Sequence, residues 1–254
     1  MKKQLLIIFA GMLAATPALH AQSLKVMSYN IHHGADAAEV NQLDNIARFI
    51  QSSGADLVGL QEVDSVCRRS GNVDQMKRLG ELTGLHYVFV RHRAYDGGAY
   101  GQGILSRYPV ADVRNDRVTL LTGSNGSTAL LSVRVSLPGE KEVTFASVHF
   151  ALDSASRMVQ ANETVNYLQV RGLPVILTGD LNTLPTNPDV QRLLEVYKET
   201  DTKNLLTFPV DPAVKKIDYI LVSKEHLKKV KAYRVFNGVK LSDHLPVMAT
   251  VQMR

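Results

Sequence analysis

Apolar runs that end in polar side chains recur along the chain. The clearest begins at Pro174 and continues into Leu177-Thr178-Gly179-Asp180-Leu181-Asn182, where a carboxylate and a carboxamide follow an apolar strand. Side chains at positions i and i+2 of an extended chain share a face, so Asp180 and Asn182 are predicted to point into one site. Both residue types are also common in turns and at helix N-caps. This stretch alone leaves the two interpretations open.

The same pattern predicts the remaining elements. Residues 23–31 read as an apolar strand, residues 40–52 carry apolar side chains at helical spacing, and residues 55–63 read as a second strand that ends in a Gln-Glu pair. Strands separated by short turns follow in the middle of the chain and indicate antiparallel pairing. Helices are predicted at 40–52, 74–83, 154–170 and 189–196, and strands at 23–31, 55–63, 86–90, 103–107, 118–121, 129–135, 143–150, from Pro174 onward, 216–222, 230–236 and within 242–251.

Two connections and the overall architecture complete this picture. Residues 95–101, which contain two tyrosines and three glycines, are predicted to form a mobile loop, and residues 124–127 a hairpin-like junction. Hairpins combined with helical crossovers predict an α/β fold in which two packed sheets have helices on their outer faces. No linker or repeat interrupts the chain after its N-terminal segment.

The N-terminal segment has the features of a signal peptide. Lys2 and Lys3 precede an apolar run from Leu5 to Ala15 that is too short to span a bilayer, and Ala21 offers a small residue for cleavage. The predicted organisation is a signal peptide at 1–21 and one domain at 22–254. We therefore expect export to the periplasm or the extracellular space, without a transmembrane segment in the mature chain.

Composition and charge narrow the function. The 254 residues are 45% hydrophobic and 21% charged, as in ordinary globular proteins. Cys67 is the single cysteine, so an internal disulfide is excluded. Loss of residues 1–21 removes two lysines and no acid, which lowers the net charge from +5 to +3. This charge permits an anionic substrate but does not indicate a polybasic nucleic-acid surface.

The predicted strand ends carry the residue types of a metal-assisted phosphoester hydrolase. Carboxylate and amide oxygens suit a hard cation such as Mg²⁺, whereas a zinc site would favour histidine and cysteine. Histidines can exchange protons near neutral pH. His32 and His33, which follow the first predicted strand, are interpreted as loop residues in preference to metal ligands. The candidate set is Asn30, Glu62, His149, Asp180, Asn182, Asp218, Asp243 and His244.

At these positions the chain resembles the endonuclease/exonuclease/phosphatase superfamily. The matching segments occur in the family's order and extend over nearly the whole mature chain. They are Ser28-Tyr29-Asn30, Leu60-Gln61-Glu62-Val63, Ile104-Leu105-Ser106-Arg107, Ser147-Val148-His149, Gly179-Asp180-Leu181-Asn182, Ile217-Asp218-Tyr219 and Ser242-Asp243-His244-Leu245-Pro246.

The resemblance implies a four-layer α/β sandwich with its site at one rim of both sheets. It implies Glu62 as principal Mg²⁺ ligand, with Mn²⁺ as a possible substitute and with Asn30 and Asp243 assisting. In the implied chemistry, Asp180 orients or deprotonates the attacking water, and His244, paired with Asp218, acts on that water or on the phosphate. Asn182 holds a phosphoryl oxygen, and His149 protonates the leaving group or stabilises the transition state.

Four further residues are candidates for substrate binding. Gln102 stands where many relatives carry asparagine, and it can donate to phosphate. Arg68 is equally consistent with phosphate recognition or a solvated position, and Tyr100 with a substrate face or a cover for the sheet. Arg157 follows His149 on a predicted helix and is placed near the rim of the site.

The expected function is hydrolysis of a phosphodiester, with a small or lipid-borne head group favoured over duplex DNA. A secreted non-specific nuclease is the alternative within the same chemistry, and nucleic acid stays a possible partner. A non-catalytic binding module on the same fold is the alternative of a different class, and the complete set of polar residues argues against it. The sequence leaves the substrate, the number of metals, the general base and the oligomeric state open.

Overall fold

Two strand–helix–strand units form the centre of the fold in this computed structural model, which describes residues 23–123 and 126–254. In the first unit, α1 (Leu43–Ser53) connects the parallel strands β1 (Ser23–Asn30) and β2 (Leu57–Ser65). In the second, α3 (Ser154–Gln169) connects the parallel strands β7 (Lys141–His149) and β8 (Val175–Asp180). Parallel neighbours need such crossovers, and the helical periods of 40–52 and 154–170 supply them.

Antiparallel strands extend each unit into a six-stranded sheet. The first sheet has the order β11-β12-β1-β2-β4-β3, and the second has the order β5-β6-β7-β8-β10-β9. The added strands of the first sheet are β3 (His86–Tyr95), β4 (Gly98–Ser106), β11 (Leu227–Val235) and β12 (Val247–Met253). Those of the second sheet are β5 (Val110–Thr119), β6 (Ser127–Leu137), β9 (Tyr197–Glu199) and β10 (Asp218–Ser223).

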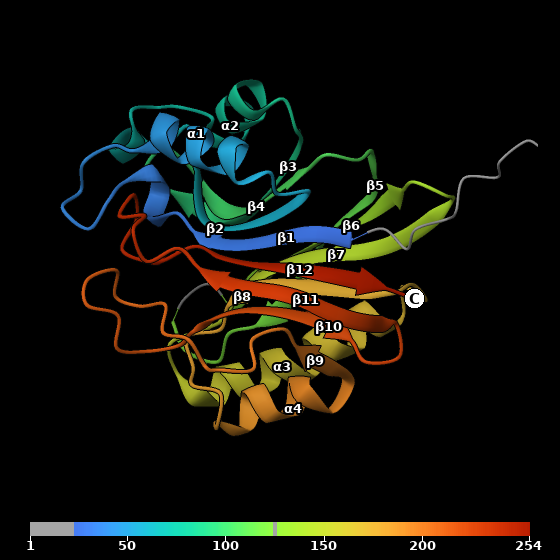
Figure 1. Cartoon of the computed structure of the whole chain (residues 1–254). Coiled ribbons are helices and arrows are strands. Elements are labelled where there is room, and N and C mark those ends of the chain that lie inside the picture. Colours follow the sequence, from blue (N-terminus) through green and yellow to red (C-terminus); the bar gives the residue numbers. More distant parts are fainter. Residues whose placement is uncertain (1–22, 124–125) are drawn as a thin grey trace, which may run out of the picture.

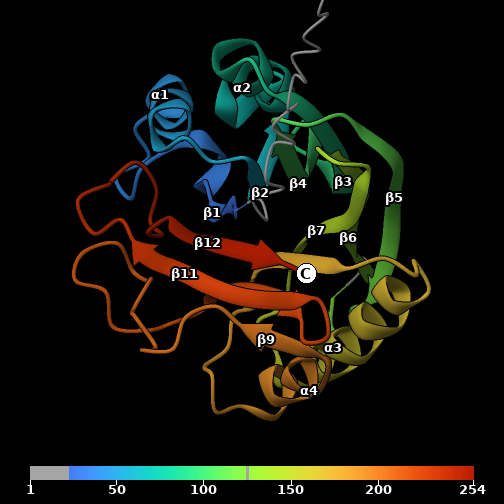
Figure 2. The same ribbon diagram turned by 45° about the vertical axis from the view of Figure 1, so that its right-hand side comes forward.

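Helices cover the outer face of each sheet. Figures 1 and 2 show α1 and α2 (Gln75–Thr83) on one side of the molecule and α3 and α4 (Pro188–Val196) on the other, with both sheets between them. Two short 3-10 turns, η1 (His32–Gly34) and η2 (Arg68–Ser70), follow β1 and β2. The four-layer α/β sandwich that the sequence predicted is confirmed.

Apolar side chains of the two inner faces form the central core. Leu57, Leu131, Phe145 and Ile220 belong to it and are completely buried. Burial of each such side chain contributes roughly 1.5–3 kcal/mol. The sheets approach closely at Gly59, where a Cβ atom would lie only 1.9 Å from the Thr178 hydroxyl oxygen. This close approach brings the ends of β2 and β8 together at one rim.

The predicted mobile loop at residues 95–101 is wrong. β3 extends to Tyr95, and β4 begins directly afterwards at Gly98, so the segment is a tight β-hairpin. A Cβ atom at Gly98 would lie 2.3 Å from the Ser65 carbonyl oxygen, and one at Gly101 would lie 2.0 Å from the Val90 carbonyl oxygen. These glycines therefore allow close backbone approach within a sheet, a use of glycine in strands that resembles a loop signal in sequence.

Two other predictions depend on residues outside the described ranges. The signal peptide at 1–21, and with it the domain division after Ala21, stays a prediction. The predicted junction at 124–127 lies partly outside them, although its last residues agree with the start of β6 at Ser127. Among the described helices, none combines the length and the apolar composition needed to cross a bilayer.

Candidate active site

Asn30, the last residue of β1, lies at the centre of a buried polar cluster. Its Nδ2 donates to Glu62 Oε1 at 3.0 Å and to Asp180 Oδ2 at 3.1 Å. Its Oδ1 accepts from the backbone N–H of His32 at 3.0 Å, which orients the amide with its NH₂ group toward the two carboxylates. Asn30 thereby connects side chains from both sheets, because Glu62 belongs to β2 and Asp180 to β8.

Glu62 reaches the site through a β-bulge inside β2. The pairing with β4 advances from Leu60 opposite Gly103 to Val63 opposite Gly101, so two residues of β2 oppose one of β4. Glu62 has a φ angle of +57°, in the left-handed region that glutamate rarely adopts. Without the bulge, Glu62 would share the helix-covered face with Leu60. The bulge instead turns its carboxylate toward the rim, where a strand end was predicted.

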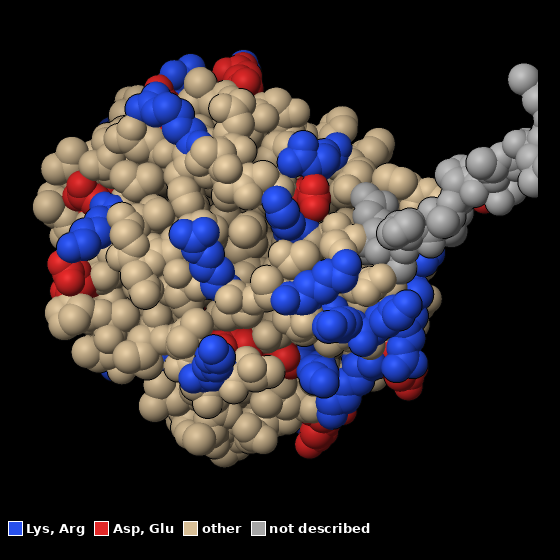
Figure 3. Space-filling view, viewed as in Figure 1, with Lys and Arg blue, Asp and Glu red and all other residues tan. Residues whose placement is uncertain are grey.

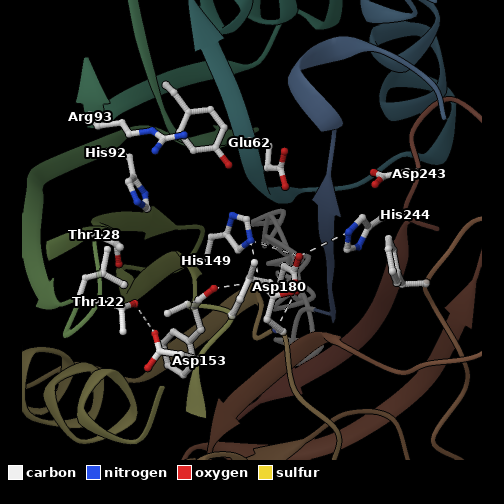
Figure 4. Close-up of a pocket in the computed structure, with 17 residues that line it drawn as sticks. Glu62, His92, Arg93, Thr122, Thr128, His149, Asp153, Asp180, Asp243 and His244 are labelled. Atoms are coloured by element: carbon white, nitrogen blue, oxygen red, sulfur yellow. Dashed lines mark hydrogen bonds and ion pairs between the residues drawn. The ribbon is translucent and has the colours of Figure 1, made fainter. Parts of the chain in front are cut away.

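Asp180, the last residue of β8, lies between two imidazoles. The Nε2 atoms of His149 and His244 are each 3.5 Å from Asp180 Oδ2, and Figure 4 shows the rings on opposite sides of the carboxylate. His149 is the last residue of β7 and pairs in register with Asp180. The parallel pairing of β7 and β8 therefore fixes the separation of these two groups.

His244 is held by a second carboxylate. Its Nδ1 lies 3.1 Å from Asp218 Oδ2, at the start of β10, and its ring packs 4.6 Å from that of Phe208, measured between centroids. Burial disfavours the charged imidazole, but the negative charges of Asp218 and Asp180 outweigh burial and raise the pKa of His244 to about 10. His244 is therefore cationic at neutral pH.

Charge interactions also act on Glu62. Burial disfavours its ionised form, but the positive charge of His149 and the hydrogen bond from Asn30 outweigh burial, and the pKa of Glu62 lies below its usual value. The carboxylate is therefore ionised over the whole physiological range. An ionised carboxylate at the rim of a pocket is suited to hold a cation.

Asn182 reaches the site by a route that differs from the predicted one. The chain does not stay extended after β8, because Asn182 adopts a φ angle of +51° and its N–H donates to Asp180 Oδ1 at 2.9 Å. Its Nδ2 lies 2.9 Å from the Phe150 carbonyl oxygen and 3.0 Å from His149 Nε2. Asp180 and Asn182 share a site because an Asx turn folds the chain back, a geometry that suits asparagine.

These groups surround a pocket of about 570 Å³ at the rim of both sheets (Figure 4). Asn30 and Asp218 lie behind its wall and are hydrogen-bonded to residues that line it. The predicted site residues in the wall are Glu62, Tyr100, His149, Asp180, Asn182, Asp243 and His244, and the other lining residues are His92, Arg93, Leu120, Thr122, Thr128, Phe150, Ala151, Leu152, Asp153 and Phe208.

Comparison with known proteins identifies the family. A sequence profile of the Endonuclease/Exonuclease/phosphatase family matches residues 27–244, which include every residue that lines this pocket. The chain belongs to the endonuclease/exonuclease/phosphatase family. Members of the family are metal-dependent phosphoesterases, and the resemblance inferred from the seven sequence segments is confirmed.

Relatives support this assignment over almost the whole chain. The uncharacterized protein YbhP of Escherichia coli K12 is 26% identical over 247 residues, which covers 91% of this chain and 97% of YbhP. A family member from Bacteroides vulgatus has the same fold, with a TM-score of 0.76, 19% identity and coverage of 92% and 100%. The mannosyl-6-phosphatase Bt3783 of Bacteroides thetaiotaomicron gives a TM-score of 0.71, 21% identity and coverage of 90% and 99%.

The oxygen-rich donor set of the pocket fits the divalent metal that the family typically uses. Glu62 faces the pocket as an ionised carboxylate, and Asp243 lines the same wall. Asp180, Asp218 and His244 each place one potential ligand atom within 4.8 Å of the others, but Asp218 and His244 are already paired. The Glu62 carboxylate is therefore suited to hold a hard cation. Asn30 directs its NH₂ group at Glu62, so it orients that carboxylate.

Three residues predicted to bind substrate do not line the pocket, and each makes other contacts. Arg68, in η2, is exposed and paired with Asp96 of the β3–β4 turn at 2.9 Å. Arg157 is buried, and its guanidinium lies 2.6 Å from Asp189 and also donates to the carbonyl oxygens of Ala151 and Leu152. Arg157 thus supports the pocket wall from behind. Its helix was placed correctly, but its ion pair with α4 was not visible in the sequence.

Gln102 also lies behind the wall. It is the single β4 residue opposite the bulge of β2, and it is completely buried. In the amide orientation that satisfies both of its ends, it donates to the Leu60 carbonyl oxygen and accepts from the backbone N–H of His149, each at 3.3 Å. Gln102 therefore supports the bulge and β7 together, and it does not line the pocket.

Sequence reasoning missed His92 and Arg93, which line the pocket opposite Asp180. It ended this strand at Val90, whereas β3 continues to Tyr95. The Arg93 guanidinium stacks 5.4 Å from the centroid of Tyr100. Burial lowers the pKa of His92 to about 3, so its ring is neutral. Burial and the charge of Glu62 raise the pKa of Tyr100, which stays a phenol. Residues 91–95, Arg-His-Arg-Ala-Tyr, show no alternation of apolar and polar side chains, so the sequence offered no strand signal there.

Proposed function

We propose that the protein hydrolyses a phosphodiester with a small or lipid-borne head group, using Mg²⁺ or Mn²⁺. The observation that supports this proposal is the placement of Asp180 between His149 and His244, beside the ionised Glu62, in one open pocket. These groups combine a cation site, a base and two imidazoles within reach of one phosphate. A binding module without catalysis would not require this complete set.

The chain's own residues divide the reaction as follows. Asp180 accepts the proton of the attacking water, because its carboxylate lines the pocket and lies between the two imidazoles. His244, cationic and held by Asp218, stabilises the charge that develops on the phosphoryl oxygens. Asn182 turns the amide N–H that faces His149 Nε2 toward one of these oxygens and keeps its bond to Phe150, and His149 in its cationic form protonates the leaving alkoxide. A cation bound at Glu62 would polarise the phosphoryl group and lower the cost of the developing charge.

The apolar part of the pocket lining favours an amphipathic substrate. Leu152 has 83% of its surface exposed although it lines the pocket, and Leu120 and Phe208 add apolar area nearby. An exposed apolar rim beside a polar centre suits a ligand with an apolar part next to its phosphate. This arrangement supports a lipid-borne head group.

The surface charge does not favour duplex DNA. Figure 3 shows Lys and Arg gathered near the C-terminus, where β11 exposes Lys228, Lys229 and Lys231. The pocket lies at the opposite end of β12, because His244 precedes this strand and the C-terminus follows it. A nuclease that contacts many phosphates needs basic residues that continue into its cleft. On this face the basic residues are gathered away from the pocket, and the arginines that line it or the pocket beside it are Arg91, Arg93 and Arg117, enough for one further anion.

The experiment is a substrate panel under controlled metal conditions. Purified protein is assayed with bis(p-nitrophenyl) phosphate, phospholipid vesicles, inositol phosphates, mannose 6-phosphate and duplex DNA, each with Mg²⁺, Mn²⁺, Zn²⁺ or EDTA. We expect diester hydrolysis with Mg²⁺ or Mn²⁺, weaker hydrolysis with Zn²⁺ and none in EDTA. Mannose 6-phosphate is included because a structural neighbour is named as a mannosyl-6-phosphatase.

Three results would contradict this proposal. Full turnover in EDTA would exclude the metal. Preferential cleavage of DNA that disappears in the His244→Ala variant would instead support a secreted nuclease. Turnover of monoesters alone would change the substrate class, and retention of each activity in His244→Ala would indicate a contaminating enzyme.

Arg93→Ala is expected to raise KM about tenfold for a diester that carries a second anionic group, with little change in kcat. Arg93 lines the pocket, and with Arg91 and Arg117 it also lines a second pocket of about 440 Å³ directly beside it. A second anion can occupy this basic extension. Arg68→Ala is the matched control, because Arg68 is exposed and paired outside the pocket. Equal effects of both substitutions would refute the assignment.

We further propose that the protein is exported after cleavage of residues 1–21. The basic start, the short apolar run and the small residue at Ala21 support this location. Fractionation of cells that express the full chain, with N-terminal sequencing of the product, tests it. An uncleaved chain in the cytoplasmic fraction would contradict the proposal.

A further inference from the structure

We propose that His32, His33 and Glu39 form a second metal site, selective for a borderline transition metal such as Zn²⁺ and separate from the catalytic cation site. His32 Nε2 lies 3.5 Å from Glu39 Oε1, and His33 Nε2 lies 3.2 Å from Glu39 Oε2. The three potential ligand atoms are within 4.8 Å of one another. This inference does not depend on the proposed phosphoesterase activity.

The donor set distinguishes this site from the catalytic pocket. Two imidazole nitrogens and one carboxylate are typical ligands of Zn²⁺, with water at the fourth position. Mg²⁺ prefers oxygen ligands and is poorly served by two imidazoles. The Glu39 side chain is 66% exposed, so solvent can supply the remaining ligand and the ion can enter directly.

The backbone holds all three ligands in an unusual conformation. His32, His33 and Glu39 have φ angles of +44°, +44° and +61°, in the left-handed region. Such conformations cost about 1 kcal/mol or more per residue and persist only where the surrounding structure imposes them. Here the restraint is visible at Gln75, whose Nε2 donates to the His33 carbonyl oxygen at 2.6 Å. The ligands therefore converge before any metal binds.

Two hydrogen bonds from the backbone to Asp36 hold the intervening loop. Asp36 Oδ1 accepts from the N–H groups of Ala38 and Val40 at 2.9 and 3.1 Å. Gln42 Nε2 donates to the other carboxylate oxygen at 2.8 Å. These contacts fold residues 36–42 into a compact loop, which returns Glu39 to the two histidines. Pre-organisation of this kind lowers the entropy that metal binding must overcome.

The second ring nitrogen of His32 connects the site to the catalytic pocket. His32 Nδ1 is buried without a hydrogen-bond partner among the described residues, and it lies 4.0 Å from Asp243 Oδ1. A metal on Nε2 would leave the proton on Nδ1, directed at this carboxylate. Metal-bound histidines usually have such a carboxylate partner. Because Asp243 lines the catalytic pocket, occupation of the site would help to orient it.

The experiment measures binding of Zn²⁺ and of Co²⁺, a spectroscopic substitute, to metal-free protein in excess Mg²⁺. The wild type is compared with Glu39→Gln and His33→Ala. We expect each substitution to remove one Zn²⁺ per chain at low micromolar concentration, or to weaken its binding at least about tenfold. The visible absorption of Co²⁺ bound to nitrogen ligands should decrease in parallel. If His33→Ala does not fold, Glu39→Gln still tests the site, because substitution of an exposed side chain should leave the fold intact.

Two matched controls separate this site from the other histidines. His86→Ala removes an exposed imidazole of β3 and should leave the Zn²⁺ stoichiometry unchanged. Glu62→Gln alters the catalytic pocket and should also retain this Zn²⁺. The proposal is overturned if Glu39→Gln binds Zn²⁺ with wild-type stoichiometry and affinity, or if the wild type binds no Zn²⁺. Neither readout requires turnover, so failure here is distinguishable from failure of the proposed function.

Discussion

Asp180→Asn is expected to lower kcat by roughly 10²–10⁴-fold, the usual contribution of a general base. The substitution keeps an oxygen that can accept from the backbone N–H of Asn182, but it removes the basic carboxylate between His149 and His244. The fold should persist, because the replacement has the same shape and Asp218 still pairs with the cationic His244. Steady-state kinetics with Mg²⁺, together with circular dichroism and thermal unfolding, measures both effects.

Asp56→Asn is the matched control for this prediction. Asp56 precedes β2, at the end of the first sheet remote from the pocket, and it pairs with Arg107 at 2.8 Å. The control removes one paired carboxylate without touching the site, so it should change stability slightly and kcat hardly at all. Wild-type kcat in folded Asp180→Asn would refute the role of Asp180 as base. An equal loss of kcat in Asp180→Asn and Asp56→Asn would indicate a general structural cause.

The strands that carry most of the site residues were predictable because both of their faces are buried, one against the other sheet and one against the helices. β1, β2, β7 and β8 read as continuous apolar runs, and three of them end at Asn30, His149 and Asp180, where the candidates were placed. The order of the motifs indicated the family, and the family implied which ends converge.

The edge strands were predicted poorly for the opposite reason. The first half of β5 is mostly exposed, and β3 exposes Arg91 and Arg93, so neither has the apolar pattern of a covered strand. β9 has only three residues, too few for a pattern. The missed part of β3 carries His92 and Arg93 into the pocket. Functional residues on an exposed edge thus gave no periodic signal, and only the pairing with β4 locates them.

Long-range polar contacts were the other limit. The sequence placed Arg157 and Gln102 close to the site, but it could not show that Asp189 binds the guanidinium or that Gln102 accepts from the His149 N–H. Such pairings depend on packing between elements that are distant in sequence. In the structure, both residues support the pocket wall from behind, although each was predicted to contact substrate.

Replacement of Glu62 is expected to have the second large effect. Glu62→Gln keeps an oxygen that can accept from Asn30 Nδ2, but it removes the negative charge that faces the pocket. We expect kcat/KM to fall at least about 100-fold at low millimolar Mg²⁺, with partial recovery at higher Mg²⁺ concentration, because the cation loses its principal ligand. Activity measured across a Mg²⁺ titration gives this result directly. An unchanged Mg²⁺ dependence would refute the assignment.

The bulge at Glu62 adds a prediction about stability that is independent of turnover. Because Glu62 has a φ angle of +57°, alanine at this position retains the strained backbone, whereas glycine adopts it freely. Both Glu62→Ala and Glu62→Gly should be inactive, yet the glycine variant should be more stable by about 1 kcal/mol in chemical unfolding. A more stable alanine variant would mean that the left-handed conformation is not imposed here. The expected order instead indicates that β2 sacrifices some stability to direct this carboxylate into the pocket.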